Sequence, residues 1–512
     1  MGRHEFLFAC TLLLFAASTA SAAGIVEHSF YVKNLTVSRL CRRQVITVVN
    51  ASLPGPTIGV QEGDTLVVHV FNQSPYNMTV HWHGVFQMLS GWADGPSMVT
   101  QCPIRPGCEW WNANVVDVET LATATGAPPQ LSDAFTINGW PGDLYPCSKH
   151  QMFELTVLPG KTYLLRIINA ALNGELFYKI ANHKMTVVAI DANYIEPYVT
   201  DVVVTTPGQT VDVLLTADQP VGSYYMAARP YASATVGGAL VPFANTTTRG
   251  VLIYDGCPSP VTPLMPTLPA FNDTPVAHKF FTGLKGLVGG PFWDLVPLKV
   301  DHEMFVTIGL AFEPCPANTS CQVSKLSASM NNESFVKPTS LSLLQAFYHN
   351  VNGFYTTDFP AKPPIEFDYT NDTVNKNPLM LVAPKSTKVT KLKFNSTVEI
   401  IFQNTNILGP ENHPMHLHGF DFHILAQGFG NYNPATDRKK LNFVNPQIRN
   451  TIGVPVGGWA VIRFVANNPG VWLLHCHLDM HLPVGLATAF MVENGPTPET
   501  TLPPPPTDLP QC

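Results

Sequence analysis

Short apolar runs separated by turn residues recur along the whole chain. A run such as residues 66–72 (LVVHVFN) is rich in β-branched and aromatic residues and ends at Asn. Runs of this kind are typical of β-strands, and few stretches show the 3.6-residue period of an amphipathic helix. The pattern therefore predicts an all-β protein made of Greek-key β-sandwiches or β-barrels.

Three segments repeat one pattern, in which an apolar run ending in Asn is followed by a polar turn and a second β-rich run. These segments are 66–85, 163–190 and 398–425. The second and third copies continue with two further strand-like runs, each after a Gly turn, in 206–229 and 456–477. The first copy begins the same continuation at 104–107 but passes directly to Cys108. The strand pair expected there is missing.

The repeat predicts three related domains in series, the first of them truncated. A chain of 512 residues is long enough for them at about 100 to 200 residues per domain. The expected parts are a signal peptide at 1–22, domain 1 at 24–108, domain 2 at 109–255, an inter-domain connection at 256–329, domain 3 at 330–495 and a C-terminal tail at 496–512.

The N-terminus has the three parts of a secretory signal peptide. Arg3 and His4 precede an apolar run at 6–17, and Ala20 and Ala22 form an A-x-A pattern. The run is shorter than the roughly 20 residues of a spanning helix, and no later run is long and apolar enough to cross a membrane. We therefore expect a secreted protein with no membrane contact after cleavage.

Ten N-x-S/T sequons predict a glycoprotein in that compartment. They begin at Asn34, Asn50, Asn72, Asn77, Asn245, Asn272, Asn318, Asn332, Asn371 and Asn395. The net charge of -7, with only 29 Lys and Arg residues, leaves no basic patch for a phosphate backbone, so nucleic acid is excluded as a partner.

The strongest chemical signal is His475-Cys476-His477, followed by His481. Thiolate and imidazole ligands together suit copper, and a His2Cys set with a weak axial position is the blue-copper pattern. Successive side chains of a strand point to opposite faces, so Cys476 should face away from its two neighbours. Cys476, His481 and His413 would form one site, and His475 and His477 would join a second.

Two further His-x-His motifs supply that second cluster, His81-Trp82-His83 and His416-Leu417-His418. Strand alternation would put both histidines of each motif on one face. Zinc is an alternative metal because His and Cys also bind it. A single cysteine shared between two faces among so many histidines favours redox copper.

With these motifs the chain resembles a plant laccase, a multicopper oxidase. The similarity extends through GWADGP at 91–96, QCPI at 101–104 and WWNANV at 110–115. The resemblance implies three consecutive cupredoxin-like domains and four copper ions in the complete family site. It implies type 1 ligands His413, Cys476 and His481, type 2 ligands His81 and His416, and type 3 ligands His83, His418, His475 and His477.

The same resemblance assigns further residues. The axial position of the type 1 site is Leu486, a non-ligand, which predicts a high reduction potential. Asp94 and Asp479 are candidate proton relays for oxygen reduction, with ordinary turn carboxylates as the alternative. The implied disulfides are Cys41–Cys147 and Cys102–Cys512. The short spacing of Cys315 and Cys321 across a turn suggests a third disulfide that closes a small loop, and Cys108 and Cys257 are unassigned.

One laccase motif is absent. The family carries a fourth His-x-His between the segments that match 101–104 and 110–112, and both of its histidines bind type 3 copper. About 60 residues are missing at this point, on the scale of half a domain. An alternative transcript, a gene-model error and a real deletion all remain open.

The resemblance implies a monomeric laccase of the apoplast that oxidises phenols, including lignin precursors and lignin-derived phenols, and reduces O2 to water. The alternative is a secreted copper-binding glycoprotein without oxidase activity, because two type 3 ligands are gone. The sequence does not predict which phenol is the substrate, since loops build such pockets.

Overall fold

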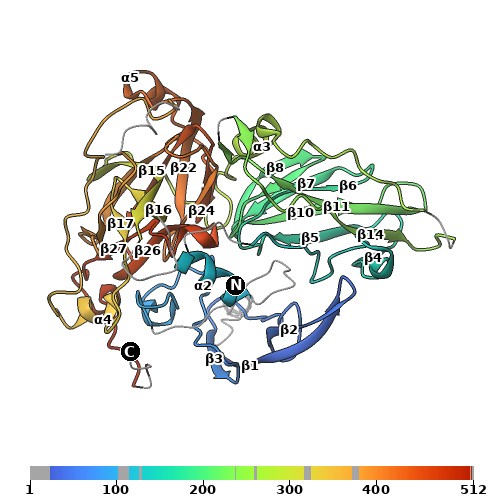
Figure 1. Cartoon of the computed structure of the whole chain (residues 1–512), viewed down its shortest axis with the longest axis horizontal. Coiled ribbons are helices and arrows are strands. Elements are labelled where there is room, and N and C mark those ends of the chain that lie inside the picture. Colours follow the sequence, from blue (N-terminus) through green and yellow to red (C-terminus); the bar gives the residue numbers. More distant parts are fainter. Residues whose placement is uncertain are drawn as a thin grey trace, which may run out of the picture. The chain divides into compact units, whose positions relative to one another are not determined.

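The computed structural model describes residues 24–101, 115–125, 130–236, 238–258, 262–315, 324–371, 380–507 and 509. The predicted signal peptide and the junction at Cys108 lie outside these residues, as do Cys102, Cys321 and Cys512. The described chain consists mainly of strands, as the apolar pattern predicted (Figure 1).

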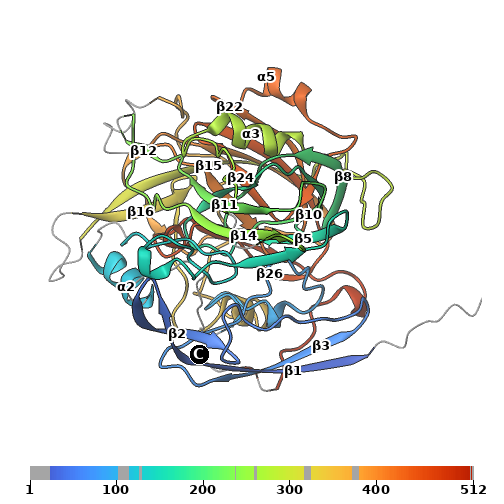
Figure 2. The ribbon, with the colours of Figure 1, turned by 90° about the vertical axis from the view of Figure 1, so that its right-hand side faces the viewer.

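The chain separates into two compact units. The first comprises the described parts of Met1–Thr36 and Val45–Pro75, and the second comprises Val37–Gln44 and the described part of Tyr76–Cys512. A three-stranded sheet in the order β2-β1-β3, most of which belongs to the first unit, is shown in blue in Figure 2. Its strands are β1 (Ile25–Arg39), β2 (Arg42–Val49) and β3 (Thr65–Asn72), and β1 pairs with β3 in parallel.

Two sheets of the second unit enclose an apolar core between residues 154 and 254. The four-stranded sheet has the order β5-β10-β7-β8 and the five-stranded sheet the order β4-β14-β11-β6-β9. The strands are β4 (Glu154–Val157), β5 (Thr162–Ile168), β6 (Glu175–Ile180), β7 (Met185–Ile190), β8 (Asn193–Thr200), β9 (Val203–Thr205), β10 (Thr210–Thr216), β11 (Ser223–Tyr231) and β14 (Thr248–Tyr254). A short hairpin joins β12 (Thr235–Val236) to β13 (Ala239–Leu240).

A second pair of sheets carries most of the candidate ligands. Its orders are β16-β15-β20-β25-β22-β23 and β19-β27-β26-β21-β24. The strands are β15 (His302–Pro314), β16 (Ser324–Met330), β19 (Thr390–Leu392), β20 (Ser396–Asn404), β21 (His413–Leu417), β22 (Phe422–Phe429), β23 (Ile448–Arg449), β24 (Thr451–Val454), β25 (Gly458–Ala466), β26 (Gly470–Cys476) and β27 (Ala487–Val492). A separate parallel pair is formed by β17 (Ser334–Phe335) and β18 (Lys385–Ser386). Strands β20, β21, β25, β26 and β27 are buried almost throughout, because side chains on both faces lie inside the protein.

Helices are few and short among the described residues. They are α2 (Val115–Thr125), α3 (Thr274–Gly283), α4 (Leu343–Tyr348) and α5 (Pro434–Asp437), with 3-10 turns η1 (Gly91–Ala93), η2 (Pro146–Ser148), η5 (Arg438–Lys440), η6 (Asp479–His481) and η7 (Pro498–Thr500). No helix in the described part of the chain is long and apolar enough to cross a bilayer.

The segment at 256–329 carries regular structure at both ends. Helix α3 begins with the Asp273 side chain accepting a hydrogen bond from the Val276 amide, and it packs Phe280 and Phe281 into the core of the first pair of sheets. Strand β15 joins the second pair of sheets by parallel pairing with β20.

One disulfide expected from the resemblance is confirmed, because Cys41 is bonded to Cys147. Cys315 is also disulfide-bonded, and its expected partner Cys321 lies outside the described residues. Among the described cysteines, Cys257 and Cys476 are free.

Candidate copper centre

Two neighbouring strands hold the candidate ligands and divide them between two faces. In the antiparallel pair β21 and β26, Met415 lies opposite Cys476 and His416 lies opposite His475. Because side chains alternate along a strand, Cys476 shares a face with His413, and His475 shares the other face with His416. The predicted division of the His475-Cys476-His477 motif between two clusters therefore follows from the register in which β21 pairs with β26.

The first cluster contains Cys476, His413 and His481, all of them buried. The Cys476 Sγ lies 3.7 Å from Nδ1 of His413 and 3.4 Å from Nδ1 of His481. His481 reaches the site because the chain turns through η6 immediately after β26. The three ligand atoms converge as a His2Cys copper site requires.

Burial sets the protonation of this cluster. It raises the pKa of the Cys476 thiol well above its ordinary value and lowers the pKa of His481 to about 4. Burial, followed by the neighbouring His481, also holds the pKa of His413 well below 6.5. Both imidazoles are therefore neutral at ordinary pH, which is the form that binds metal.

Leu486 lies in the same buried core cluster as Cys476. Its side chain is fully buried and offers no donor atom, and its carbonyl oxygen accepts a hydrogen bond from the Cys476 amide at 3.1 Å. Glu411, which the sequence analysis did not single out, places a carboxylate oxygen 3.5 Å from Nε2 of His481, and burial raises its pKa to about 7. The only signal in the sequence is an acidic residue two positions before a ligand.

Six histidines gather on the opposite face. Ring centroids lie 4.1 Å apart for His81 and His418, 4.1 Å apart for His83 and His416, and 4.9 Å apart for His83 and His477. His475 completes the group, with its ring centroid 5.2 Å from that of His418. The structure thus brings together every histidine assigned to the second cluster.

Asp94 fixes two of these rings. The Nδ1 of His81 donates to the Asp94 carbonyl oxygen at 2.7 Å, and the Nδ1 of His418 donates to the Asp94 carboxylate at 3.0 Å. Burial alone would raise the pKa of Asp94, but the electrostatic interaction with His418 and the hydrogen bonds from both histidines lower it below its ordinary value.

Backbone carbonyls fix three more rings. The Nδ1 of His416 donates to the carbonyl oxygen of Asn450 at 2.8 Å, and the Nδ1 of His475 donates to that of Cys476 at 2.8 Å. His83 is reversed, because its Nε2 donates to the Gly208 carbonyl oxygen at 2.5 Å.

Gly208 is required by this close approach. It has φ of +82°, and a Cβ at this position would lie 2.6 Å from Cδ2 of His477. In the sequence, Gly208 is recognisable only as part of a Gly turn.

The nitrogens left over fit a bound metal. In the described part of the protein, Nε2 of His81, Nδ1 of His83 and Nε2 of His416 are buried without a hydrogen-bond partner, and they lie within 4.8 Å of one another. The Nε2 atoms of His418 and His475 face each other at 3.2 Å although both rings donate through Nδ1. Opposed lone pairs and unpartnered buried nitrogens are costly unless a cation lies between them. Imidazole nitrogens are ligands that suit copper.

Burial also keeps these rings neutral. Desolvation, followed by repulsion from neighbouring histidines, holds the pKa of His83, His416 and His475 well below 6.5. Burial likewise lowers the pKa of His477 to about 4.

The prediction that the first His-x-His motif lies on a strand is wrong. His81 and His83 lie in the described segment after β3, where the backbone is irregular. Asp479 lies half-buried in η6, between Cys476 and His481, and its amide donates to the Leu172 carbonyl oxygen at 2.9 Å.

Comparison with known proteins finds similarity along nearly the whole chain. Multicopper oxidase family domains match residues 31–120, 107–257 and 358–496. Laccase-7 of Arabidopsis thaliana is 56% identical, with 98% of this chain and 99% of the relative covered. The chain belongs to the multicopper oxidase family, among the plant laccases. Laccase-9 of Arabidopsis thaliana is 50% identical, with 99% of this chain and 96% of the relative covered.

Solved structures of the multicopper oxidase family have the same fold. A laccase from Botrytis aclada superposes with a TM-score of 0.68 at 25% identity, covering 94% of this chain and 89% of that chain. Fet3p, a multicopper oxidase that functions in iron import, has a TM-score of 0.66 at 19% identity, covering 91% of this chain and 90% of that chain. Three cupredoxin-like domains are the architecture of this family, and copper is its cofactor.

The alignment with laccase-7 also bears on the missing segment. It runs over 567 positions, whereas this chain has 512 residues, so gaps of more than fifty positions fall in this chain.

Proposed function

We propose that the protein is a laccase, which oxidises phenolic small molecules in one-electron steps and reduces O2 to water. The observation that carries this proposal is the single strand β26, whose Cys476 belongs to one cluster and whose His475 belongs to the other. A copper-binding protein without oxidase activity is not favoured, because laccases match over nearly the whole chain.

We assign the ligands as the motifs indicate. His413, Cys476 and His481 would hold type 1 copper, and Leu486 would leave its axial position without a donor. The trinuclear cluster would be held by His81 and His416 at type 2 copper and by His83, His418, His475 and His477 at the type 3 pair.

Bound copper would supply one-electron redox chemistry at both clusters. The protein supplies the connection, since peptide bonds join Cys476 directly to His475 and His477. Asp94 holds His418 and His81 in place through the hydrogen bonds described above, which supports a positioning role at least as well as proton relay. For Asp479, the relay role rests on its position in the motif.

The same proposal extends to substrate class and compartment. The phenols include lignin precursors and lignin-derived phenols, and the chain acts as a monomeric, secreted glycoprotein of the apoplast. Eight of the predicted sequons have an exposed Asn, namely Asn34, Asn50, Asn72, Asn77, Asn245, Asn272, Asn371 and Asn395. We keep the domain bounds of 24–108, 109–255 and 330–495, with the connection at 256–329, as part of the proposal.

Copper loading followed by a simple phenol tests the function. The full chain with copper should show the intense thiolate-to-copper absorption of a blue site, and adding phenol in the absence of O2 should bleach it. Cys476→Ser should lose the absorption while keeping the fold, because Ser is nearly isosteric but lacks the soft ligand. A folded, copper-loaded protein that is colourless, or blue but not bleached by phenols, would contradict the proposal.

A further inference from the structure

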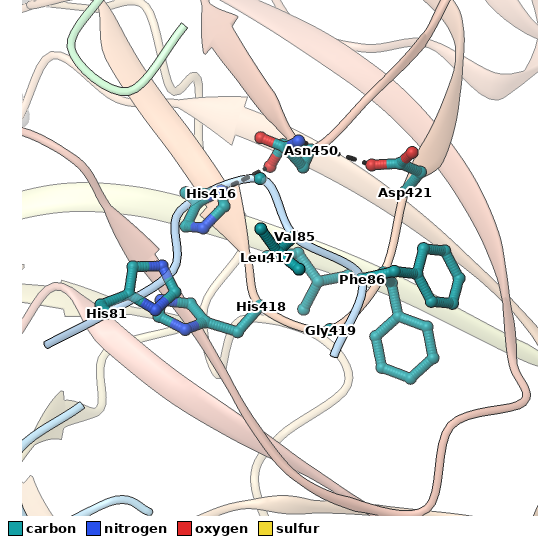
Figure 3. A pocket seen from close by; sticks show the side chains of 11 residues that line it. His81, Val85, Phe86, His416, Leu417, His418, Gly419, Asp421 and Asn450 are labelled. Atoms are coloured by element: carbon teal, nitrogen blue, oxygen red, sulfur yellow. Dashed lines mark hydrogen bonds between the residues drawn. The ribbon is translucent and has the colours of Figure 1, made fainter. Parts of the chain in front are cut away.

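A small cavity opens beside the histidine cluster. It has a volume of about 10 Å³, which is room for about one water molecule. His81, His416 and His418 line one end, and Asp421 and Asn450 line the other (Figure 3). One cavity therefore has a carboxyl group in its lining together with three histidines of the cluster.

Asp421 follows His418 by three residues, between β21 and β22, and its side chain is partly exposed. Its Oδ2 accepts a hydrogen bond from Nδ2 of Asn193 at 2.8 Å, and its Oδ1 accepts a longer one from Nδ2 of Asn450 at 3.5 Å. Both donors are neutral amides. Neither donor therefore brings a positive charge that would stabilise the ionised form of this carboxyl group.

The charged neighbours do not supply that charge either. Arg449 pairs with Asp191, to which its Nε and Nη2 donate at 2.9 Å and 3.1 Å. Among the described residues Asp421 has no ion pair, and Asp191 repels its negative form. Burial, followed by this repulsion, raises the pKa of Asp421 to about 6. The group can therefore carry a proton at mildly acidic pH and release it.

The contacts of Asn450 tie this carboxyl to the cluster. The Nδ2 of Asn450 faces Asp421, while its carbonyl oxygen accepts from Nδ1 of His416, as the dashed lines in Figure 3 show. The Oγ1 of Thr451 donates to Oδ1 of Asn450 at 3.1 Å. These bonds orient Asn450 so that its side-chain Nδ2 points toward Asp421, while its backbone carbonyl oxygen supports the His416 ring.

We propose that Asp421 is the proton donor that serves this cavity during oxygen reduction. The inference rests on the laccase function proposed above. Reducing one O2 to two water molecules takes four electrons, supplied by four phenols, and four protons. In each delivery the Asp421 carboxyl gives its proton to the cavity water, which passes a proton on to reduced oxygen. Bulk water then restores the proton to the carboxylate.

Rapid mixing of reduced protein with O2 tests the donor role. The copper-loaded full chain is reduced with hydroquinone without O2, then mixed with O2, and recovery of the blue absorption is followed. Asp421→Asn should slow recovery about 100-fold, the lower end of the range for a positioned acid, and leave the hydroquinone step unchanged. Asp421→Glu should stay within a few fold of wild type. The wild-type rate should fall as pH rises past about 6, and the rate of Asp421→Asn should not.

Asp201→Asn is the matched control, because Asp201 is an exposed carboxylate paired with Lys179. It should reoxidise like wild type. Recovery of Asp421→Asn within twofold of wild type would overturn the proposal, and so would an equal slowing in Asp421→Glu, which would indicate a purely structural role.

Infrared spectroscopy of the copper-free full chain gives a second test that needs no turnover. A carboxylic acid band should be present below the pKa of Asp421, shift promptly in D2O, and disappear in Asp421→Asn. Absence of this band would overturn the proposal whatever the activity. A wild-type protein that shows the band and is blue, but is never reoxidised by O2, would refute the proposed laccase function instead.

Discussion

At the scale of single residues, the axial position of the cysteine cluster has the clearest energetic consequence. Leu486 is fully buried and contributes no ligand atom from its side chain. A thioether in that place would stabilise copper through a soft axial donor, and its absence leaves the oxidised ion less stabilised.

We therefore expect Leu486→Met to lower the reduction potential of the type 1 site. Spectroelectrochemical titration of the blue absorption measures the potential, with Leu486→Ile as the control for repacking. The expectation fails if Leu486→Met is folded and blue but has an unchanged or higher potential.

The raised pKa of Asp421 should make the free energy of unfolding depend on pH. Its pKa is raised from 3.8 to about 6 in the folded protein, so its stabilising contribution is complete below 3.8 and is lost as pH rises through about 6. Asp421→Asn should therefore gain stability relative to wild type between these values and then level off. Urea unfolding of the copper-free proteins at a series of pH values measures the difference.

The matched variant Asp201→Asn should behave differently over the same range. The hydrogen bond from Lys179 lowers the pKa of Asp201 below 3.8, so this carboxyl is already charged in both states above that pH. Its stability difference from wild type should be flat. A constant difference for Asp421→Asn as well would mean that its pKa is not raised.

At the scale of elements, the sheet of the first unit has an exposed apolar face. Ile25, Tyr31 and Phe71 are 71%, 44% and 46% exposed, and the rings of Tyr31 and Phe71 stack at 5.0 Å. In the described sheet, β2 and β3 are both edge strands. Exposed apolar faces and open edges favour association between chains.

Replacing Tyr31 and Phe71 together with Thr should reduce aggregation and raise the secreted yield, because Thr keeps β propensity without the apolar surface. Size-exclusion chromatography of the secreted protein measures the effect, and the double substitution Tyr194→Thr with Val199→Thr on β8 controls for general surface polarity. An unchanged aggregate fraction would argue against this face as the cause.

The sequence predicts elements better than contacts. The alternation of side chains along residues 470–477 was enough to predict that Cys476 faces away from His475 and His477, because successive side chains of one strand point to opposite faces. The same rule misplaced His81 and His83 on a strand, since the backbone of that segment is irregular. The contacts of Asp94, Gly208 and Asp421 could not be predicted, because each joins segments more than a hundred residues apart or depends on a turn conformation.

At the scale of the whole molecule, the two clusters differ in how complete they are. All three ligands of the cysteine cluster come from residues 413–481, two of them on strands β21 and β26 and the third in the turn η6 that follows. The histidine cluster also needs His81 and His83 from the segment that precedes the missing part, and it holds six histidines where the family pattern has eight.

We expect the cysteine cluster to load fully and the 512-residue chain to reduce O2 slowly. Inserting the missing segment with its His-x-His motif after Gly107 should raise O2 consumption with a phenol by at least an order of magnitude per type 1 copper, because each type 3 copper regains a ligand. An insert in which both of these histidines are Ala is the control. Equal turnover by the 512-residue and restored chains would show that other residues complete the cluster.

The reversed hydrogen bonding of His83 bears on when the site is assembled. Four rings of its cluster carry the proton on Nδ1 and one carries it on Nε2, each held by an oxygen of the fold. For these five rings the fold itself sets the tautomer and restricts ring rotation. Copper therefore binds to rings that are already ordered, so little of its binding free energy is used to order them. That free energy contributes to affinity and to selection against ions that need another arrangement of donors.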